Sequence, residues 1–126
     1  MELKPQEVIE THDKLTATIA RAFDLAGRLG KAYGIHYDSG GVFLTRYGDR
    51  WGLFVPDEKG GYTPLPQKRL SVKLKFLELG IDTFFSAYLG HVAKTHEGMR
   101  NRLAHAGPLI EKYEALVHDL IGDAEK

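Results

Sequence analysis

The stretch Arg100-Asn101-Arg102-Leu103-Ala104-His105, followed by Gly107-Pro108, decides how the C-terminal part of this chain is interpreted. It reads R-N-x-x-x-H, and Asn101 is the only asparagine among the 126 residues. Proline and glycine are the poorest residues inside a helix, so Gly107-Pro108 predicts that one helix ends here and another begins at Pro108. An arginine that can hold a phosphate and a histidine that can move a proton are two components of a metal-free ribonuclease.

The specificity of this motif depends on the asparagine. An arginine separated from a histidine by four to six residues is expected about once by chance in a chain of this composition. When asparagine must directly follow the arginine and histidine must stand at the fifth place, the chance falls to on the order of three in a thousand. The complete motif is therefore a useful signal, whereas its loose form is not.

Residues Met99 to His105 resemble the motif of the HEPN superfamily, small helical domains of prokaryotic toxins and defence ribonucleases. The resemblance implies a four-helix bundle with the motif near the end of the third helix, and a dimer in which two motifs meet. It also implies an RNA substrate and a possible antitoxin protein as partners. One HEPN subgroup has a tyrosine two residues after the histidine; this chain has Gly107 there, so the modification chemistry of that subgroup is not implied.

Cleavage of RNA by its own 2′-hydroxyl needs a base, an acid and a charge that stabilises the phosphorane. His105 is the expected acid or base, Arg100 the phosphate ligand, and Asn101 a residue that orients one of them. Five residues of continuous helix rotate by about 140°, so Arg100 and His105 would diverge unless the helix ends between them or a second protomer completes the site. The alternative is a surface helix end without catalytic function.

Three neighbours of the motif are candidates for supporting roles. We expect Arg102 to contact the RNA backbone, Glu97 to hold the guanidinium of Arg100, and His96 to share its helix face. The segment His96 to Arg100 begins like the zincin motif H-E-x-x-H but has arginine at the second ligand position. With no cysteine in the chain, we expect neither a metal site nor a cofactor.

A second basic segment precedes the motif. Lys68, Arg69, Lys73 and Lys75 lie within eight residues without an acid among them. Arg69 and Lys73 are the candidates for binding RNA phosphates, and a solvated helix face is the alternative.

The composition is that of one globular domain, residues 1–126, with 43% hydrophobic and 27% charged residues. The formal net charge is zero, so affinity for RNA must come from a local patch. The absence of cysteine excludes disulfides, and no apolar run reaches the length of a membrane span. We therefore expect a cytoplasmic protein with no membrane association.

Periodicity predicts a mainly α fold of four helices with an inserted β-hairpin at about residues 41–56, and the resemblance implies that these helices form a HEPN-like four-helix bundle. Helices are expected at residues 5–33, from about 67 to Gly80, at about 83–104 with Asp82 as N-cap, and from Pro108 onward. The alternation in Leu70 to Phe76 also allows a strand there. Within the insertion, about residues 34–66, Gly48-Asp49 suits a two-residue turn.

The register of this hairpin gives it one apolar face, composed of Val42, Leu44, Trp51, Leu53 and Val55. It is expected to pack against the bundle, to form part of a dimer interface, or to cover an active site as a lid.

The motif favours a metal-independent endoribonuclease that acts by transesterification, and the resemblance to HEPN proteins implies a toxin or defence system and a dimeric R-N-x-x-x-H site. The rival interpretation is a non-catalytic HEPN-like module that binds RNA, a nucleotide or a protein partner. The third interpretation is a helical protein that only binds other proteins and in which the motif arises by coincidence.

Overall fold

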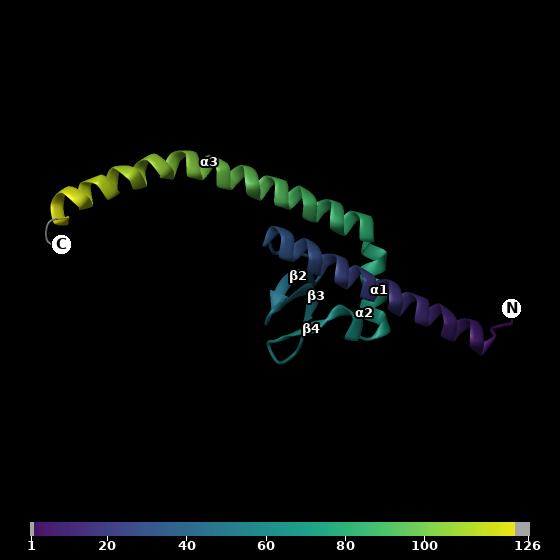
Figure 1. Ribbon diagram of the computed structural model, residues 1–126. Helices are drawn as coiled ribbons and strands as arrows, with labels where there is room; N and C mark the ends of the chain where they lie inside the picture. The colour runs from purple at the N-terminus through teal and green to yellow at the C-terminus, as the bar shows by residue number, and fades with distance from the viewer. Residues whose placement is uncertain (1, 123–126) are drawn as a thin grey trace. The chain divides into compact units, whose positions relative to one another are not determined.

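The computed structural model describes residues 2–122 and is mainly helical, with a small antiparallel sheet (Figure 1). The chain divides into two units, one that reaches to Leu89 and one that begins at Gly90. The elements, in chain order, are α1 (Pro5–Tyr33), β1 (Tyr37–Ser39), β2 (Val42–Tyr47), β3 (Arg50–Pro56), β4 (Tyr62–Pro64), a 3₁₀ turn (Leu65–Gln67), α2 (Leu70–Leu79) and α3 (Ile81–Ile121).

Helix α1 begins and ends as the sequence predicts. Pro5 occupies the first helical position, where its missing N–H is not needed. Gly34 ends the helix in the left-handed region, with φ of 66°, and its N–H donates to the Gly30 carbonyl at 2.7 Å. The buried residues of this helix all lie in its second half; they are Ile19, Ala22, Phe23, Ala26 and Gly30.

The predicted hairpin is confirmed and forms the centre of a four-stranded sheet in the order β1-β2-β3-β4. Tyr47 pairs with Arg50, so Gly48 and Asp49 alone form the turn, and Gly48 has φ of 66°. Leu44 pairs with Leu53, and both are fully buried. The outer strands β1 and β4 were not predicted, because each has three residues and shows too little alternation to recognise.

The sheet packs on α1, so the hairpin lies against a helix of its own chain, although the described residues do not form the four-helix bundle expected there. Helix α1 and strand β3 approach closely because each has a glycine at the point of contact, Gly27 in α1 and Gly52 in β3. A Cβ at Gly27 would lie 2.7 Å from the Trp51 carbonyl oxygen, and one at Gly52 would lie 2.5 Å from the Phe23 ring. Any larger residue at these positions would push β3 away from the helix.

Helix α2 and the start of α3 complete the core of the first unit with aromatic side chains. Leu70 to Phe76 is helical, so the strand alternative is excluded. Phe76, Phe84 and Tyr88 are fully buried, and Phe84 stacks edge-on against Phe76 and Tyr37 at centroid distances of 5.5 and 5.6 Å. The Tyr88 hydroxyl donates to the Ile35 carbonyl at 3.0 Å. Burial raises the pKa of Tyr88, and the neighbouring Tyr33 raises it further.

The expected break between α2 and α3 is confirmed, but its details differ. Gly80, with φ of 98°, separates the two helices, and α3 begins at Ile81. Asp82 is therefore not an N-cap; it lies in the first turn of α3 and accepts a hydrogen bond from the Ser86 hydroxyl at 3.3 Å.

The prediction that a helix ends at Gly107-Pro108 is wrong. Helix α3 continues through Pro108 as one element of 41 residues, so the residues described contain three α-helices where four were expected. Proline at this position removes one hydrogen bond, to the Ala104 carbonyl, and on an exposed helix water can satisfy that carbonyl. Good helix formers such as Leu, Glu, Lys and Ala on both sides sustain the helix.

None of these helices, as far as residues 2–122 show, combines the length and the apolar character needed to span a membrane.

Candidate functional site

The R-N-x-x-x-H segment lies in the middle of α3, within the second unit. Arg100, Asn101, Arg102 and His105 are all exposed. Among the residues that the structure describes, no hydrogen bond or ion pair holds any of these four side chains, and none joins Glu97 to Arg100. The helix displays the motif without fixing the orientation of its side chains.

The unbroken helix separates the two catalytic candidates. Arg100 and His105 project about 140° apart, so one chain does not direct both at a single phosphate. Asn101 is adjacent to Arg100 in sequence and about 100° from it on the helix. The motif residues are therefore available to a ligand, but the chain by itself does not assemble them into a site.

A continuous apolar seam runs along the same part of α3. Its nine positions alternate steps of four and three residues, the spacing of a heptad repeat. They are Val92, His96, Met99, Leu103, Ala106, Ile110, Tyr113, Val117 and Leu120, and all but His96 are apolar or aromatic. This α3 seam was missed in the sequence, because the expected break at Gly107-Pro108 divided it into two short pieces.

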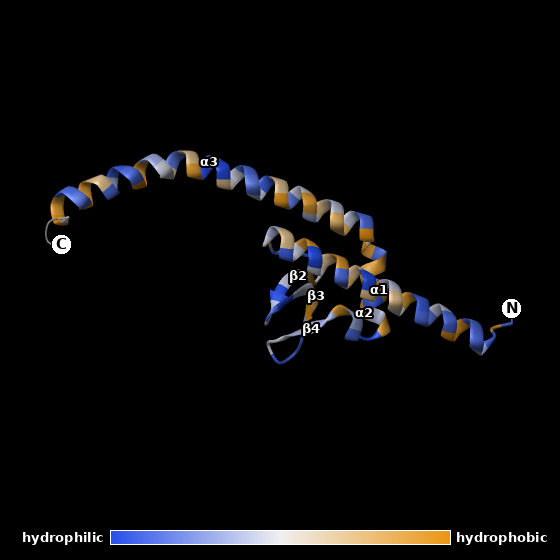
Figure 2. Cartoon of the chain, in the orientation of Figure 1, coloured by the Kyte–Doolittle hydropathy of each residue, from blue (hydrophilic) through white to orange (hydrophobic). Residues whose placement is uncertain are grey.

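The side chains of the α3 seam are open to solvent. Leu103 is 68% exposed, Ile110 59% and Leu120 72%. Figure 2 shows hydrophobic residues recurring along α3 between hydrophilic ones. Residues 90–122 contain no element besides α3, so nothing in this described part of the second unit covers the seam.

The motif residues occupy different angular positions around α3 relative to the seam. Arg100 and Arg102 flank it on opposite sides, at the e and g positions between Met99, a d position, and Leu103, the a position of the next heptad. Asn101 points to the opposite side of the helix, and His105 lies about 130° from the middle of the seam. His96, which we expected to support Arg100, is itself a seam residue.

Charge is unevenly distributed along this helix. Residues 90–107 carry Lys94, Arg100 and Arg102 against Glu97, a net charge of 3 − 1 = +2. Residues 108–122 carry Lys112 against Glu111, Glu114 and Asp119, a net charge of 1 − 3 = −2. The two halves of the helix are therefore electrostatically complementary to each other.

The basic segment of the first unit does not form one surface. Arg69 precedes α2 and is exposed, as a phosphate ligand requires. Lys73 is 5% exposed, and its ammonium donates to the Thr16 hydroxyl at 3.4 Å. The expectation that Lys73 faces solvent to contact RNA is thus corrected: the turn of α2 on which it lies faces α1, because Phe76, one turn further along, is a core residue.

Sequence reasoning missed another group of cations. Arg28 and Lys31 of α1 and Arg46 and Arg50 of the hairpin line one pocket in the first unit. They are up to 22 positions apart and follow no spacing rule, so only the folded chain brings them together. No group of acidic or histidine side chains within residues 2–122 is arranged to hold a metal ion.

Comparisons of the chain with protein families, with curated proteins and with solved structures found no match.

Proposed function

We propose that this chain is a non-catalytic module that binds a protein partner through α3, and that the partner is a second copy of the chain lying antiparallel to the first. The α3 seam carries this proposal, because it presents eight apolar or aromatic side chains in a heptad pattern and no other element of residues 90–122 covers them. Helices of this kind gain most of their stability from burying such a face.

The distribution of charge selects the antiparallel arrangement. Parallel pairing would place the two +2 halves together and the two −2 halves together. Antiparallel pairing places each positive half opposite a negative one, and because the dimer is symmetric each favourable contact occurs twice. Arg100 and Glu114 both occupy e positions on the same flank of the seam, and antiparallel pairing brings this flank of one helix against the same flank of the other.

Cross-linking tests both the pairing and its direction. The chain has no cysteine, so any disulfide formed by a variant with one introduced cysteine joins two chains at that known position. A mixture of Val92→Cys and Val117→Cys chains, whose cysteines lie towards opposite ends of the α3 seam, should form the mixed disulfide in large excess over either symmetric one. Excess of the symmetric disulfides would support parallel pairing and contradict the antiparallel proposal, and a strict monomer in sedimentation velocity at micromolar concentration would contradict pairing altogether.

The second candidate function is the metal-independent endoribonuclease, with RNA as substrate and an antitoxin as a further partner. Its support is the complete R-N-x-x-x-H motif on an open surface. A HEPN-like four-helix bundle would require α3 to separate at Gly107-Pro108, where proline has removed a hydrogen bond, so that the C-terminal part folds back as a fourth helix. Pairing along the α3 seam alone would leave His105 facing outward, so this function needs that rearrangement or a different contact face.

For this candidate we expect Arg100→Ala and His105→Ala each to reduce cleavage of a labelled single-stranded RNA by roughly 100-fold. The matched control is His118→Ala, which removes another exposed histidine of α3 and should leave the rate unchanged. Activity should survive EDTA. Wild-type protein that cleaves no RNA, or His105→Ala that cleaves as fast as wild type, would reject the enzyme and leave the binding module.

A further inference from the structure

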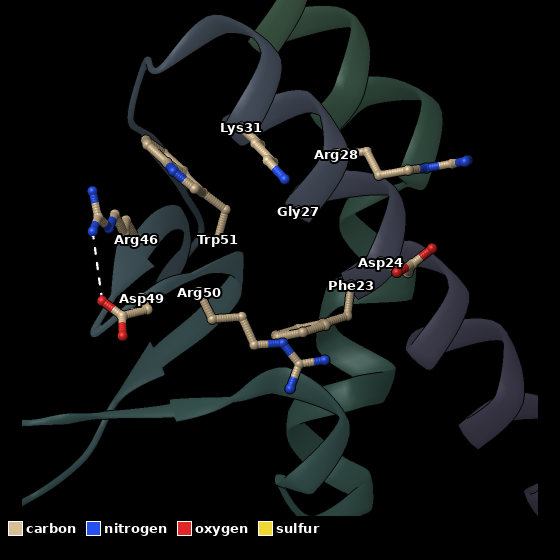
Figure 3. Close-up of a pocket in the computed structure, with 9 residues that line it drawn as sticks. All are labelled: Phe23, Asp24, Gly27, Arg28, Lys31, Arg46, Asp49, Arg50 and Trp51. Atoms are coloured by element: carbon tan, nitrogen blue, oxygen red, sulfur yellow. Dashed lines mark ion pairs between the residues drawn. The ribbon is translucent and has the colours of Figure 1, made fainter.

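A basic pocket lies in the first unit between α1 and the β2–β3 hairpin, far along the sequence from the R-N-x-x-x-H motif. Its volume is about 430 Å³. Figure 3 shows the cations of α1 on one side and those of the hairpin on the other. The lining carries four cations, Arg28, Lys31, Arg46 and Arg50, and two carboxylates, Asp24 and Asp49, a surplus of 4 − 2 = +2 in a chain of zero net charge.

Two of the guanidinium groups are oriented by contacts within the first unit, one by the turn of the hairpin and the other by an aromatic ring of α1. Arg46 donates through Nε to the Gly48 carbonyl at 3.1 Å and lies 3.7 Å from Asp49. Arg50 lies over the Phe23 ring, with 4.7 Å from Cζ to the centroid. Both side chains are exposed. Oriented guanidinium groups lose less conformational entropy when they bind a phosphate than free ones do.

The α1 side contributes cations without partners in the residues described. Lys31 and Arg28 are exposed, and neither is joined to a carboxylate within 4.0 Å. In Figure 3 the Arg28 side chain extends outward from the helix, whereas Lys31 lies on the side of Trp51. Lys31 is therefore the residue of α1 that most directly completes the pocket.

The aromatic rings that line the pocket, those of Trp51 and Phe23, already pack against other groups of the protein. An added Cβ at Gly30 would collide with the Trp51 ring, so that ring lies directly against the backbone of α1. The His36 ring lies 4.7 Å from Trp51. Phe23 is contacted by Arg50 and packs edge-on against Phe54 at 5.5 Å. With its rings occupied, the pocket can recognise the charge of a ligand but offers little surface on which a base could stack.

We infer that this pocket binds the phosphate groups of a nucleotide, either free or within a single strand, through Lys31, Arg46 and Arg50. Recognition of phosphate alone makes the binding independent of base sequence and strongly dependent on salt. This inference does not rest on pairing through α3 or on ribonuclease activity, since all the residues involved belong to the first unit.

The test is fluorescence anisotropy of a labelled single-stranded RNA of about 20 nucleotides, with ATP and pyrophosphate as competitors. One phosphate contact to a single strand contributes about 0.7 to the slope of log K against log salt, which is about five-fold in affinity at 0.1 M salt. Lys31→Ala should weaken binding by about this factor and reduce the slope. Lys31→Glu should weaken it by more than about ten-fold, because it also adds repulsion.

The matched control is Lys14, an exposed lysine of the same helix outside the pocket. Lys14→Ala and Lys14→Glu should change the affinity less than about two-fold. Binding of RNA that ATP does not displace assigns the strand as ligand, and binding of ATP in preference to RNA assigns the free nucleotide. Equal losses from Lys31→Glu and Lys14→Glu would overturn the inference, as would wild-type protein that binds none of the three probes. Circular dichroism of each variant verifies that it is folded.

Discussion

Leu103→Asp combined with Ile110→Asp should convert the paired chain to a monomer, with a dissociation constant raised by more than about 1000-fold. Burying a Leu or Ile side chain contributes about 1.5–3 kcal/mol, and a symmetric pair contains each residue twice. The loss of four such side chains is thus about 6 kcal/mol or more, beyond the roughly 4 kcal/mol that a 1000-fold change requires. Burial of the new carboxylates adds a further cost. Sedimentation velocity over a range of concentrations measures the change.

The control places the same charges on the opposite side of the helix. Asn101→Asp combined with Ala115→Asp introduces two carboxylates at exposed positions away from the α3 seam. This variant should retain the association of wild type within a few-fold. If it dissociates as readily as the seam variant, the effect comes from net charge and pairing along the seam is contradicted.

Phe84→Ala should lower the free energy of unfolding of the first unit by about 3–5 kcal/mol. Phe84 is 1% exposed and stands at the centre of the aromatic core, with ring centroids 5.6 Å from Tyr37 and 5.5 Å from both Phe76 and Phe85. Its removal leaves a cavity that these rings cannot fill without breaking their edge-on contacts. Urea denaturation followed by far-UV circular dichroism gives the difference.

Leu89→Ala is the comparison for this variant, because it shortens an apolar side chain of the same helix that is 46% exposed. Its effect on unfolding should stay below about 1 kcal/mol. Phe84→Leu, which keeps most of the volume, should fall between the two. A loss below about 1 kcal/mol for Phe84→Ala would mean that the core does not depend on this ring.

Local patterns predicted those parts of the fold whose signals are local. The turn residues Gly48-Asp49 between two strand-forming segments identified the hairpin and its register, and Pro5 and Gly34 marked the ends of α1. The same rules failed at Gly107-Pro108. A proline disfavours a helix by a few kcal/mol, a cost that a long run of helix-forming neighbours can offset.

The residues of the candidate sites also fall into those that local sequence identified and those that depend on the folded structure. The sequence located the R-N-x-x-x-H motif and predicted that Arg100 and His105 diverge on a continuous helix, which is what α3 shows. It could not show that Lys73 turns towards Thr16, since that depends on which face of α2 meets α1. The pocket formed by Lys31, Arg46 and Arg50 could not be predicted either, because its residues come from α1, β2 and β3, which meet only in the folded unit.

The sequence by itself determined the helices α1 and α2, the central hairpin, the position of the motif and the lack of disulfides. These follow from side-chain periodicity, turn chemistry and composition, which act over a few residues. The tertiary structure alone decided that α3 continues through Pro108, that the α3 seam is open, that Lys73 is buried, and that four cations line one pocket. Each of these features depends on which faces of the helices and strands pack together and which stay exposed. That choice is set by the free energy of the whole folded unit, so no short segment of sequence determines it.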